Sequence, residues 1–525
     1  MSAPSLAPLV ERPHQQLSPR ALRNILIAMI TALVAVIAAM SGLNVAQQQL
    51  AIDLGASQGA VLWIINAYTV TLAALLLPVG AIGDRWGRKT VLLTGLAVFG
   101  VATVASVVAT SVAMMIAARV VAGAGAAMIM PVTLSIITSS FPPEERAKAI
   151  GVWAGFAGAG GMIGLFVSSF MIDVLTWRWV FALPLALVAI SAFMTARFAP
   201  NSKEEREHPF DTIGSVLSAL AIGGIVLGVH EGPENGWSHP LTLTGIGVGV
   251  LALLLFIAWE RRHPEPLLDI SAFRDRGLAS GTLTLVIVFG VMFGVFLVLY
   301  PFFQAVLGWS ALRSATAMLP MALMMMPMST IAPRIAGRIG KRKTMIIGVA
   351  IFAGGLATMA LRASVEGGYM SVLPGLIGIG LGMGLTMTPA TEAITETLPH
   401  DKQGVASALN DTSRELGGAL GVALLGSVLS AGYRTAIEPL LVGVPAALAE
   451  PAKEGIGSAF AVAAQAGDQA PVIIDAAKHA FVEGWVNSMW LGVGMAAIAL
   501  VYLIVRGPTG VRDLEATSPD YVDVG

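Results

Sequence analysis

Three ionisable residues lie close together inside one long apolar stretch of the chain. Asp411, Arg414 and Glu415 fall within residues 404–430, which are otherwise apolar enough to form a membrane helix. Asp411 and Glu415 are four residues apart and therefore share a helix face, with Arg414 beside them. Each charge near the middle of a bilayer costs about 2.5–3.5 kcal/mol on insertion scales. A carboxylate there can bind and release a proton, so we predict proton coupling or substrate contact; a structural ion pair is the alternative.

Another charge inside an apolar stretch, Arg119, begins the segment RVVAGAGAAMIMP (119–131). Its counterion cannot be identified from the sequence. We predict a role in substrate binding or proton relay, and a fixed packing pair is the alternative.

The segment GDRWGRKT (83–90) joins two apolar stretches and combines two glycines with several charges. The glycines permit a tight turn, and the charges can pair across helix ends to hold one conformation closed. Anchoring by positive charge explains Arg88 and Lys89 but not Asp84. We therefore predict a gate latch made by Gly83, Asp84, Arg85, Gly87, Arg88 and Lys89.

Weaker patterns indicate a cavity and a helix seam. Trp63, Asn66 and Tyr68 could line a cavity together with Met324, which belongs to a methionine-rich stretch. Packing is the stronger interpretation for Trp63 and for the methionines. Gly160 and Gly164, spaced as GxxxG, predict a close helix–helix contact, with bending as a secondary possibility.

These residues are positioned by apolar stretches that are each long enough to cross a bilayer, which takes about 20 residues. We predict fourteen membrane helices, near 24–43, 60–82, 90–109, 112–137, 150–172, 179–198, 213–229, 241–259, 278–300, 315–331, 345–361, 370–388, 404–430 and 485–505.

Composition supports a membrane protein and narrows its chemistry. Apolar residues make up 56% and charged residues 12% of the chain, so its solvent is the bilayer. The net charge of −1 argues against a nucleic-acid partner. With no cysteine, no metal-ligand spacing among seven histidines and no Walker A segment, we predict no metal, no cofactor and no enzyme activity. Most lysines and arginines fall in alternate connecting segments, which predicts an integral cell-membrane protein with both termini in the cytoplasm.

The chain also repeats itself at an offset near 253 residues. GDRWGRKT (83–90) matches AGRIGKRKT (336–344), pairing Arg85 with Arg338 and Gly87 with Gly340. Two six-helix halves with two inserted helices explain this repeat, and such halves suit alternating access around a central site. The predicted division is an N-terminal tail (1–23), a first bundle (24–200), a linker with the inserted helices (201–277), a second bundle (278–505) and a C-terminal tail (506–525).

Residues 433–484 form the longest predicted connection on the outer side. Two alanine-rich segments, VPAALAEPAKEGIGSAF and VIIDAAKHAFVEG, predict a hairpin of two short amphipathic helices. A surface lid and a merely solvated insertion are equally compatible with this pattern.

Taken together, these motifs resemble the major facilitator superfamily, and specifically its fourteen-span drug:proton antiporters. GDRWGRKT and RVVAGAGAAMIMP are similar to the loop and span-four motifs of the superfamily. WIINAY (63–68) and ALNDTSRELGGALGVALLGS (408–427) are similar to exporters of quaternary ammonium compounds and methyl viologen. The resemblance implies an all-α major facilitator fold and a role in antibiotic resistance.

The chain departs from that pattern at three places. Ala39 and Asn66 stand where such exporters usually carry aspartates, and GLFVSS (164–169) replaces GPxxGG. The missing acids disfavour dicationic substrates and leave proton coupling to Asp411 and Glu415.

The resulting hypothesis is a proton-driven exporter of amphipathic small molecules that acts as a monomer. Substrate would bind between the two halves, and protonation of Asp411 or Glu415 would promote its release outward. The alternatives are an exporter of a native metabolite or lipid, or a facilitator that is not coupled to protons.

Overall fold

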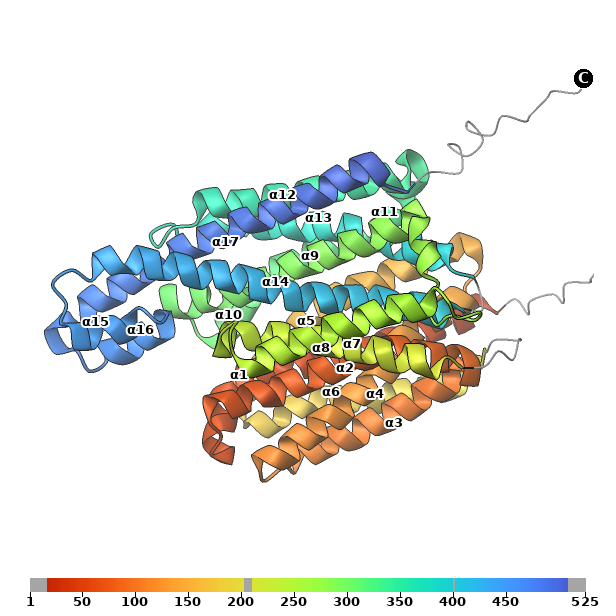
Figure 1. The fold of residues 1–525 in the computed structure, drawn as a ribbon, viewed down its shortest axis with the longest axis horizontal. Helices are drawn as coiled ribbons and strands as arrows, with labels where there is room; N and C mark the ends of the chain where they lie inside the picture. The colour runs from red at the N-terminus through yellow and green to blue at the C-terminus, as the bar shows by residue number, and fades with distance from the viewer. Residues whose placement is uncertain (1–16, 203–209, 400–401, 509–525) are drawn as a thin grey trace, which may run out of the picture.

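In the computed structural model, which describes residues 17–202, 210–399 and 402–508, the chain is a bundle of long helices (Figure 1). Fourteen helical segments of the described residues are long and apolar enough to cross a membrane, which confirms the predicted number. The predicted tails and the charged linker lie largely outside the described residues. The helices of the first half are α1 (Pro19–Leu54), α2 (Gln58–Trp86), α3 (Arg88–Val107), α4 (Val112–Ser140), α5 (Pro143–Val174) and α6 (Ala182–Phe198), with a 3-10 turn, η1 (Trp177–Phe181), before α6.

The inserted pair and the second half are also helical. The inserted helices are α7 (Thr212–Asn235) and α8 (Pro240–Glu260). The second half consists of η2 (Ile270–Arg274), α9 (Arg276–Pro301), η3 (Phe302–Val306), α10 (Ala311–Ala317), α11 (Leu319–Ile339), α12 (Lys341–Arg362), α13 (Gly368–Thr397), α14 (Gln403–Leu440), α15 (Ala446–Ala452), α16 (Ile456–Ala463), η5 (Gly467–Gln469) and α17 (Ala470–Arg506). Here α10 and α11 together form one membrane crossing.

Local sequence explains where several helices begin. Ser18, Ser57 and Ser111 each accept a hydrogen bond from a backbone N–H of the first turn of α1, α2 and α4. Such caps satisfy donors that the helix itself leaves without partners. Proline stands in the first turn of α5 and α8, where its missing N–H costs nothing.

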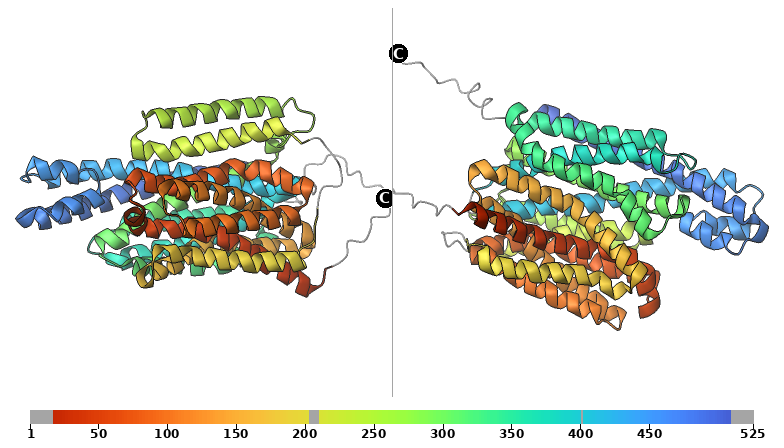
Figure 2. Two further views of the ribbon diagram at one scale, coloured as in Figure 1. Left: turned by 90° about the horizontal axis from the view of Figure 1, so that it is seen from below. Right: turned by 180° about the vertical axis from the view of Figure 1, so that it is seen from behind.

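The bundle has two six-helix halves, and α7 and α8 pack outside them (Figure 2). Glycines allow the inserted pair to approach closely: a side chain on Gly224 would come within 2.9 Å of Gly249. Helix α7 packs on α2 of the first half and on α14 of the second half. The inserted pair therefore covers the line along which the two halves meet.

Helix α1 begins and α17 ends at the same end of the bundle, which we call the terminal end (Figure 1). The opposite end, the hairpin end, carries α15 and α16. The first alanine-rich segment forms these two helices, but the second is not a separate helix, because residues 472–484 continue α17. The segment Ala470–Gly484 contains only one proline, Pro471, which stands in the first turn, so nothing interrupts the helix before it enters the bundle.

Candidate functional site

A buried network of polar side chains surrounds Asp411 in the middle of α14. Asp411 is fully buried, and its Oδ1 accepts hydrogen bonds from Arg414 Nη1 at 3.3 Å and Asn410 Nδ2 at 3.2 Å. Asn410 in turn accepts a hydrogen bond of 2.9 Å from Thr391 Oγ1 of α13. Asp411 Oδ2 has no hydrogen-bond partner in the described part of the chain. The carboxylate is thus paired on one side and unsatisfied on the other.

Arg414 carries this network across to the first half. Its Nη2 donates a hydrogen bond of 3.3 Å to the backbone oxygen of Ala157 in α5. The guanidinium lies 4.5 Å from the ring centre of Phe289 in α9 and 5.7 Å from that of Trp153 in α5. Trp153 Nε1 donates to Thr133 Oγ1 of α4 at 3.1 Å. The Asp411–Arg414 ion pair therefore lies where helices of both halves meet.

Glu415 differs from Asp411 although both belong to the same turn of α14. Its side chain is half-buried, and it forms no hydrogen bond or salt bridge with any described residue. Arg414 pairs with Asp411 at the i,i+3 spacing and leaves Glu415 without a cation in contact. A carboxylate held by no donor can be protonated without breaking a contact, whereas protonation of Asp411 weakens an ion pair.

Arg119 in α4 is buried, and its printed contacts are with uncharged groups. Its Nη2 donates a hydrogen bond of 3.5 Å to the backbone oxygen of Ala39 in α1, and its guanidinium lies 4.2 Å from the ring centre of Tyr68. Tyr68 is fully buried and donates to Val36 O at 3.0 Å. Among the described residues no carboxylate forms a salt bridge with Arg119, but Glu415 of α14 lies within electrostatic range of Tyr68, the ring against which Arg119 packs.

At the terminal end, Asp84 links the first half to the second. It is buried and accepts hydrogen bonds from Arg88 Nε at 3.1 Å and Nη2 at 2.7 Å. Its two oxygens also accept from the backbone N–H groups of Gly404, at 2.8 Å each, and of Val405, at 3.2 Å. These N–H groups belong to the first turn of α14, where the helix dipole favours a negative charge. Asp84 of α2 thus caps a helix of the opposite half.

The helices on either side of this contact touch backbone to backbone. A side chain on Gly80 of α2 would come within 2.6 Å of the Gly404 carbonyl oxygen and of Ala408 in α14. A second seam joins α5 to α11, where Ser329 Oγ donates a hydrogen bond of 2.8 Å to the Gly151 carbonyl. The two halves are therefore closed against each other at the terminal end.

The other residues of the predicted latch shape the turn around Asp84. Gly87 has φ +101°, a conformation that favours glycine, and Gly83 packs against Val132. Lys89 Nζ donates to the Ala196 carbonyl of α6 at 2.8 Å, whereas Arg85 is exposed at the end of α2. The loop is therefore tied to its own half as well as to α14.

The residues predicted to line a cavity belong to two different helices, α2 and α11. Trp63 is half-buried and Asn66 is buried in α2, in the same helix as Tyr68. Met324 is 36% exposed, whereas its neighbour Met325 is buried against Gly158 of α5. Met325, and not Met324, therefore packs at the contact between the two halves.

The glycine pair of α5 lies against α1. A side chain on Gly164 would come within 2.6 Å of Ala38, and one on Gly160 would contact Ile37. This glycine face brings α5 and α1 close together within the first half.

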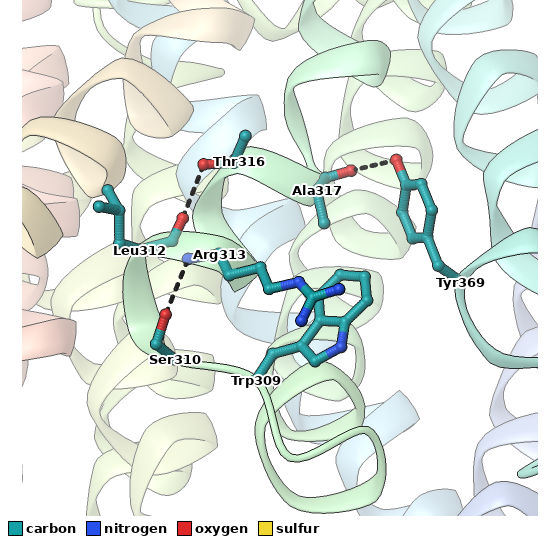
Figure 3. A pocket seen from close by; sticks show the side chains of 7 residues that line it. All are labelled: Trp309, Ser310, Leu312, Arg313, Thr316, Ala317 and Tyr369. Atoms are coloured by element: carbon teal, nitrogen blue, oxygen red, sulfur yellow. Dashed lines mark hydrogen bonds between the residues drawn. The ribbon is translucent and has the colours of Figure 1, made fainter.

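A pocket of about 470 Å³ at the beginning of the α10–α11 crossing was not predicted (Figure 3). The Arg313 guanidinium lies 4.1 Å from the ring centre of Trp309, and Phe303 stacks against the same indole at 5.6 Å. Tyr369 donates to the Ala317 carbonyl at 2.9 Å. The aromatic residues were the available signal, but Tyr369 lies 60 residues after Trp309, so their meeting could not be read from the sequence. The pocket is lined by Trp309, Ser310, Leu312, Arg313, Thr316, Ala317 and Tyr369.

Comparison with known proteins shows related sequences over most of the chain. The family model described as Major Facilitator Superfamily matches residues 27–422. The multidrug efflux pump LfrA of Mycolicibacterium smegmatis is 31% identical over 430 residues, which cover 81% of this chain and 84% of the relative. The methyl viologen resistance protein SmvA of Salmonella typhimurium is 30% identical over 465 residues, covering 87% and 92%. The multidrug resistance protein Stp of Mycobacterium tuberculosis is 30% identical over 399 residues, covering 76% and 74%.

Solved structures of the same fold are much more distant in sequence. The human organic anion transporter MFSD10 superposes with a TM-score of 0.60 at 13% identity, covering 93% of this chain and 100% of that structure. The proton:xylose symporter XylE superposes with a TM-score of 0.59 at 12% identity, covering 95% and 99%. At these identities the likeness shows the fold alone.

Proposed function

This chain belongs to the Major Facilitator Superfamily, and we propose that it is a multidrug efflux transporter that exchanges amphipathic small molecules for protons. The names of LfrA, Stp and SmvA support drug efflux, and they do not favour the export of a native metabolite or an uncoupled facilitator. The observation that carries the proposal is the buried Asp411–Arg414 pair at the contact between the two halves. Membership in this family also indicates a transporter rather than an enzyme.

Proton coupling is assigned to the two carboxylates of α14, and the ion pair supplies its physical basis. When Asp411 is charged, its attraction for Arg414 keeps the guanidinium between α5 and α9. A proton that binds Asp411 removes this attraction and frees Arg414 to change partners. Glu415 is the natural first acceptor, because nothing in the described structure must be displaced from it. Each charge that moves across 100 mV is worth about 2.3 kcal/mol, enough to bias such an equilibrium more than tenfold.

The gate is assigned to the loop around Asp84. Its hydrogen bonds to the start of α14 hold the terminal end closed, so the proposed cycle opens this end only when these bonds break. Arg119 is assigned to substrate binding or proton relay, since it is a buried cation without a carboxylate partner among the described residues.

We place the protein in the cell membrane, acting as a monomer, with the terminal end in the cytoplasm. Basic residues concentrate there, for example Arg88, Arg342 and Lys343, as the positive-inside rule requires. The bundles at 24–200 and 278–505 would then rock around the site between them, and the hairpin at 433–484 would face outward.

The test replaces Asp411→Asn and Glu415→Gln separately in the full-length chain reconstituted into vesicles. We expect each variant to lose drug efflux driven by a pH gradient while its abundance and thermal unfolding stay close to those of the parent. Glu483→Gln is a matched control, because Glu483 is an exposed carboxylate in α17. If both variants keep full pH-driven efflux, the assignment of the coupling residues is wrong.

A further inference from the structure

A second, larger cavity lies at the terminal end, away from the proposed transport site. It has a volume of about 880 Å³ and lies between the loop that follows α8, the turn η2 and the end of α17. Its lining is polar and comes from residues 260–274 together with Arg506. The cavity thus joins the inserted helices to the second half.

Three arginines face this cavity, and only Arg274 has an acid of the same lining, Asp269, within electrostatic range. Arg261, Arg274 and Arg506 all line it, and their side chains are exposed. None of them forms a salt bridge or a side-chain hydrogen bond within the described ranges 17–202, 210–399 and 402–508. Guanidinium groups present several donors in a fixed fork that matches phosphate oxygens, so three of them around one cavity favour an anionic ligand.

The two acids of the same lining are already engaged by the backbone. Glu260 is buried, and its Oε2 accepts a hydrogen bond of 3.1 Å from the Leu268 N–H. Asp269 Oδ1 accepts one of 2.8 Å from the Ser271 N–H at the start of η2. These bonds hold both acids against the loop backbone, and no salt bridge is formed by Arg261 or Arg506 within the described residues, so these two arginines together with Arg274 can contact a ligand.

Apolar helix faces lead up to the cavity from two sides. On α8, Leu251, Leu254 and Leu255 are between 50% and 59% exposed, and the helix ends one residue before Arg261. On α17, Ile504 and Val505 are more than half exposed directly before Arg506. In a membrane-spanning bundle such faces contact acyl chains, and the charges at the helix ends lie at the level of the headgroups. The cavity therefore combines a lining that contains three arginines with exposed apolar helix faces beside it.

We propose that this cavity binds one anionic phospholipid, with its phosphate held by Arg261, Arg274 and Arg506. Its acyl chains would lie along the exposed faces of α8 and α17. A basic pocket between membrane helices is suited to a lipid headgroup for both electrostatic and geometric reasons. The site lies outside the Asp411–Arg414 network and does not depend on the proposed efflux activity.

The test measures binding of fluorescently labelled phosphatidylglycerol and phosphatidylcholine to the delipidated full-length protein in detergent. We expect the parent to prefer phosphatidylglycerol. The triple variant R261Q/R274Q/R506Q should bind this lipid about 10-fold more weakly or worse, because each basic side chain contributes to the attraction. Arg262→Gln is the matched control: Arg262 is adjacent and exposed but does not line the cavity, so its loss should change binding less than about 2-fold.

A charge-preserving variant and a competing ion distinguish a lipid site from misfolding and from a phosphate site. The triple lysine variant R261K/R274K/R506K keeps the charges but not the forked donors, so it should recover only part of the binding. Thermal unfolding of the glutamine variant distinguishes lost contact from misfolding. The proposal is overturned if both lipids bind equally, if the triple glutamine variant binds like the parent, or if R262Q weakens binding as much. Displacement of the labelled lipid by millimolar inorganic phosphate would show a site for the free ion instead.

Discussion

The loop between α2 and α3 and the loop between α11 and α12 are two copies of one sequence pattern, yet only the first joins the two halves. Both turn at a glycine of positive φ, Gly87 at +101° and Gly340 at +90°. The first copy carries Asp84, which caps α14 across the contact between the halves. The second copy has Gly337 at the matching position, with open space around it. The backbone turn is therefore shared, and the carboxylate that reaches the other half is present in the first loop alone, which is why we assign the proposed latch to that loop.

The second loop uses its charges within its own half. Lys341 follows Gly340 and forms salt bridges with Glu392, at 3.4 Å, and Glu396 of α13. Helices α12 and α13 belong to the same bundle, so these bridges stiffen that bundle without fastening it to the other. The difference shows that two copies of one repeated loop can make contacts of different kinds, and the proposed gate is therefore asymmetric.

The largest effect is expected from Asp84→Ala, which removes the latch. A buried charge pair that loses one partner costs about 3–5 kcal/mol, and the N–H groups of Gly404 and Val405 lose their acceptor as well. We expect the terminal end to open and efflux to fail. Because the chain has no cysteine, spin labels at Lys148→Cys and Lys343→Cys can measure the distance between α5 and α12. Gly337→Ala, the same site in the second copy, is the control; equal distance distributions for D84A and the parent would contradict the latch.

A smaller effect is expected from Gly404→Ala. Its added methyl group would meet the Gly80 carbonyl and the Asp84 carboxyl group, so α14 must move away from α2. Overpacking of this kind costs about 1–3 kcal/mol. Thermal unfolding and the same label pair should show a destabilised, partly opened terminal end. An unchanged melting temperature together with an unchanged distance would mean that the two helices are not in close contact.

Lys341→Gln should affect the second half alone. The change leaves Glu392 buried without its cation, but Lys341 is partly exposed, so the expected loss of stability is about 1 kcal/mol. The melting temperature should fall slightly while the distance between the halves stays at the parent value. A shift in that distance would show that the second loop also acts between the halves.

The smallest effect is expected from Gly337→Asp, which copies the latch residue into the second loop. The position is exposed and has open space around it, so the new carboxylate has no helix end to cap there. Stability should change by no more than about 0.5 kcal/mol, as for most surface substitutions. A clearly raised melting temperature with a narrower distance distribution would instead reveal a latent second latch.

Sequence patterns predicted the architecture well, because membrane helices need long apolar stretches and the repeat is visible in the motifs themselves. The pattern also singled out Asp84, because anchoring by positive charge does not explain an acid among the basic residues of this loop. The sequence could not identify the start of α14 as the partner of Asp84, because every residue other than proline has a backbone N–H group and the sequence does not show which of them are available.

The same limit applies to the buried charges. The local sequence does not indicate that Arg414 pairs with Asp411 and not with Glu415. The position of the Arg414 guanidinium is set by its contacts with Ala157 and Phe289, which belong to other helices. Arg119 likewise rests on a tyrosine ring and a backbone carbonyl, contacts that only the fold assembles. The hairpin end was partly missed because an uninterrupted helix such as α17 carries no signal for where the membrane begins.

Helix α14 runs for 38 residues, about 57 Å at 1.5 Å per residue, and several devices lie along it. Its first turn rests on Asp84, its middle holds Asp411 and Arg414, and near its far end Tyr433 donates to the Ala452 carbonyl of α15. One continuous helix thus connects the proposed latch, the charge pair and the hairpin. If α14 slides or tilts as one body when the proposed latch opens, α15 moves with it, so a dye attached to α15 would report the state of that latch from the opposite face of the membrane.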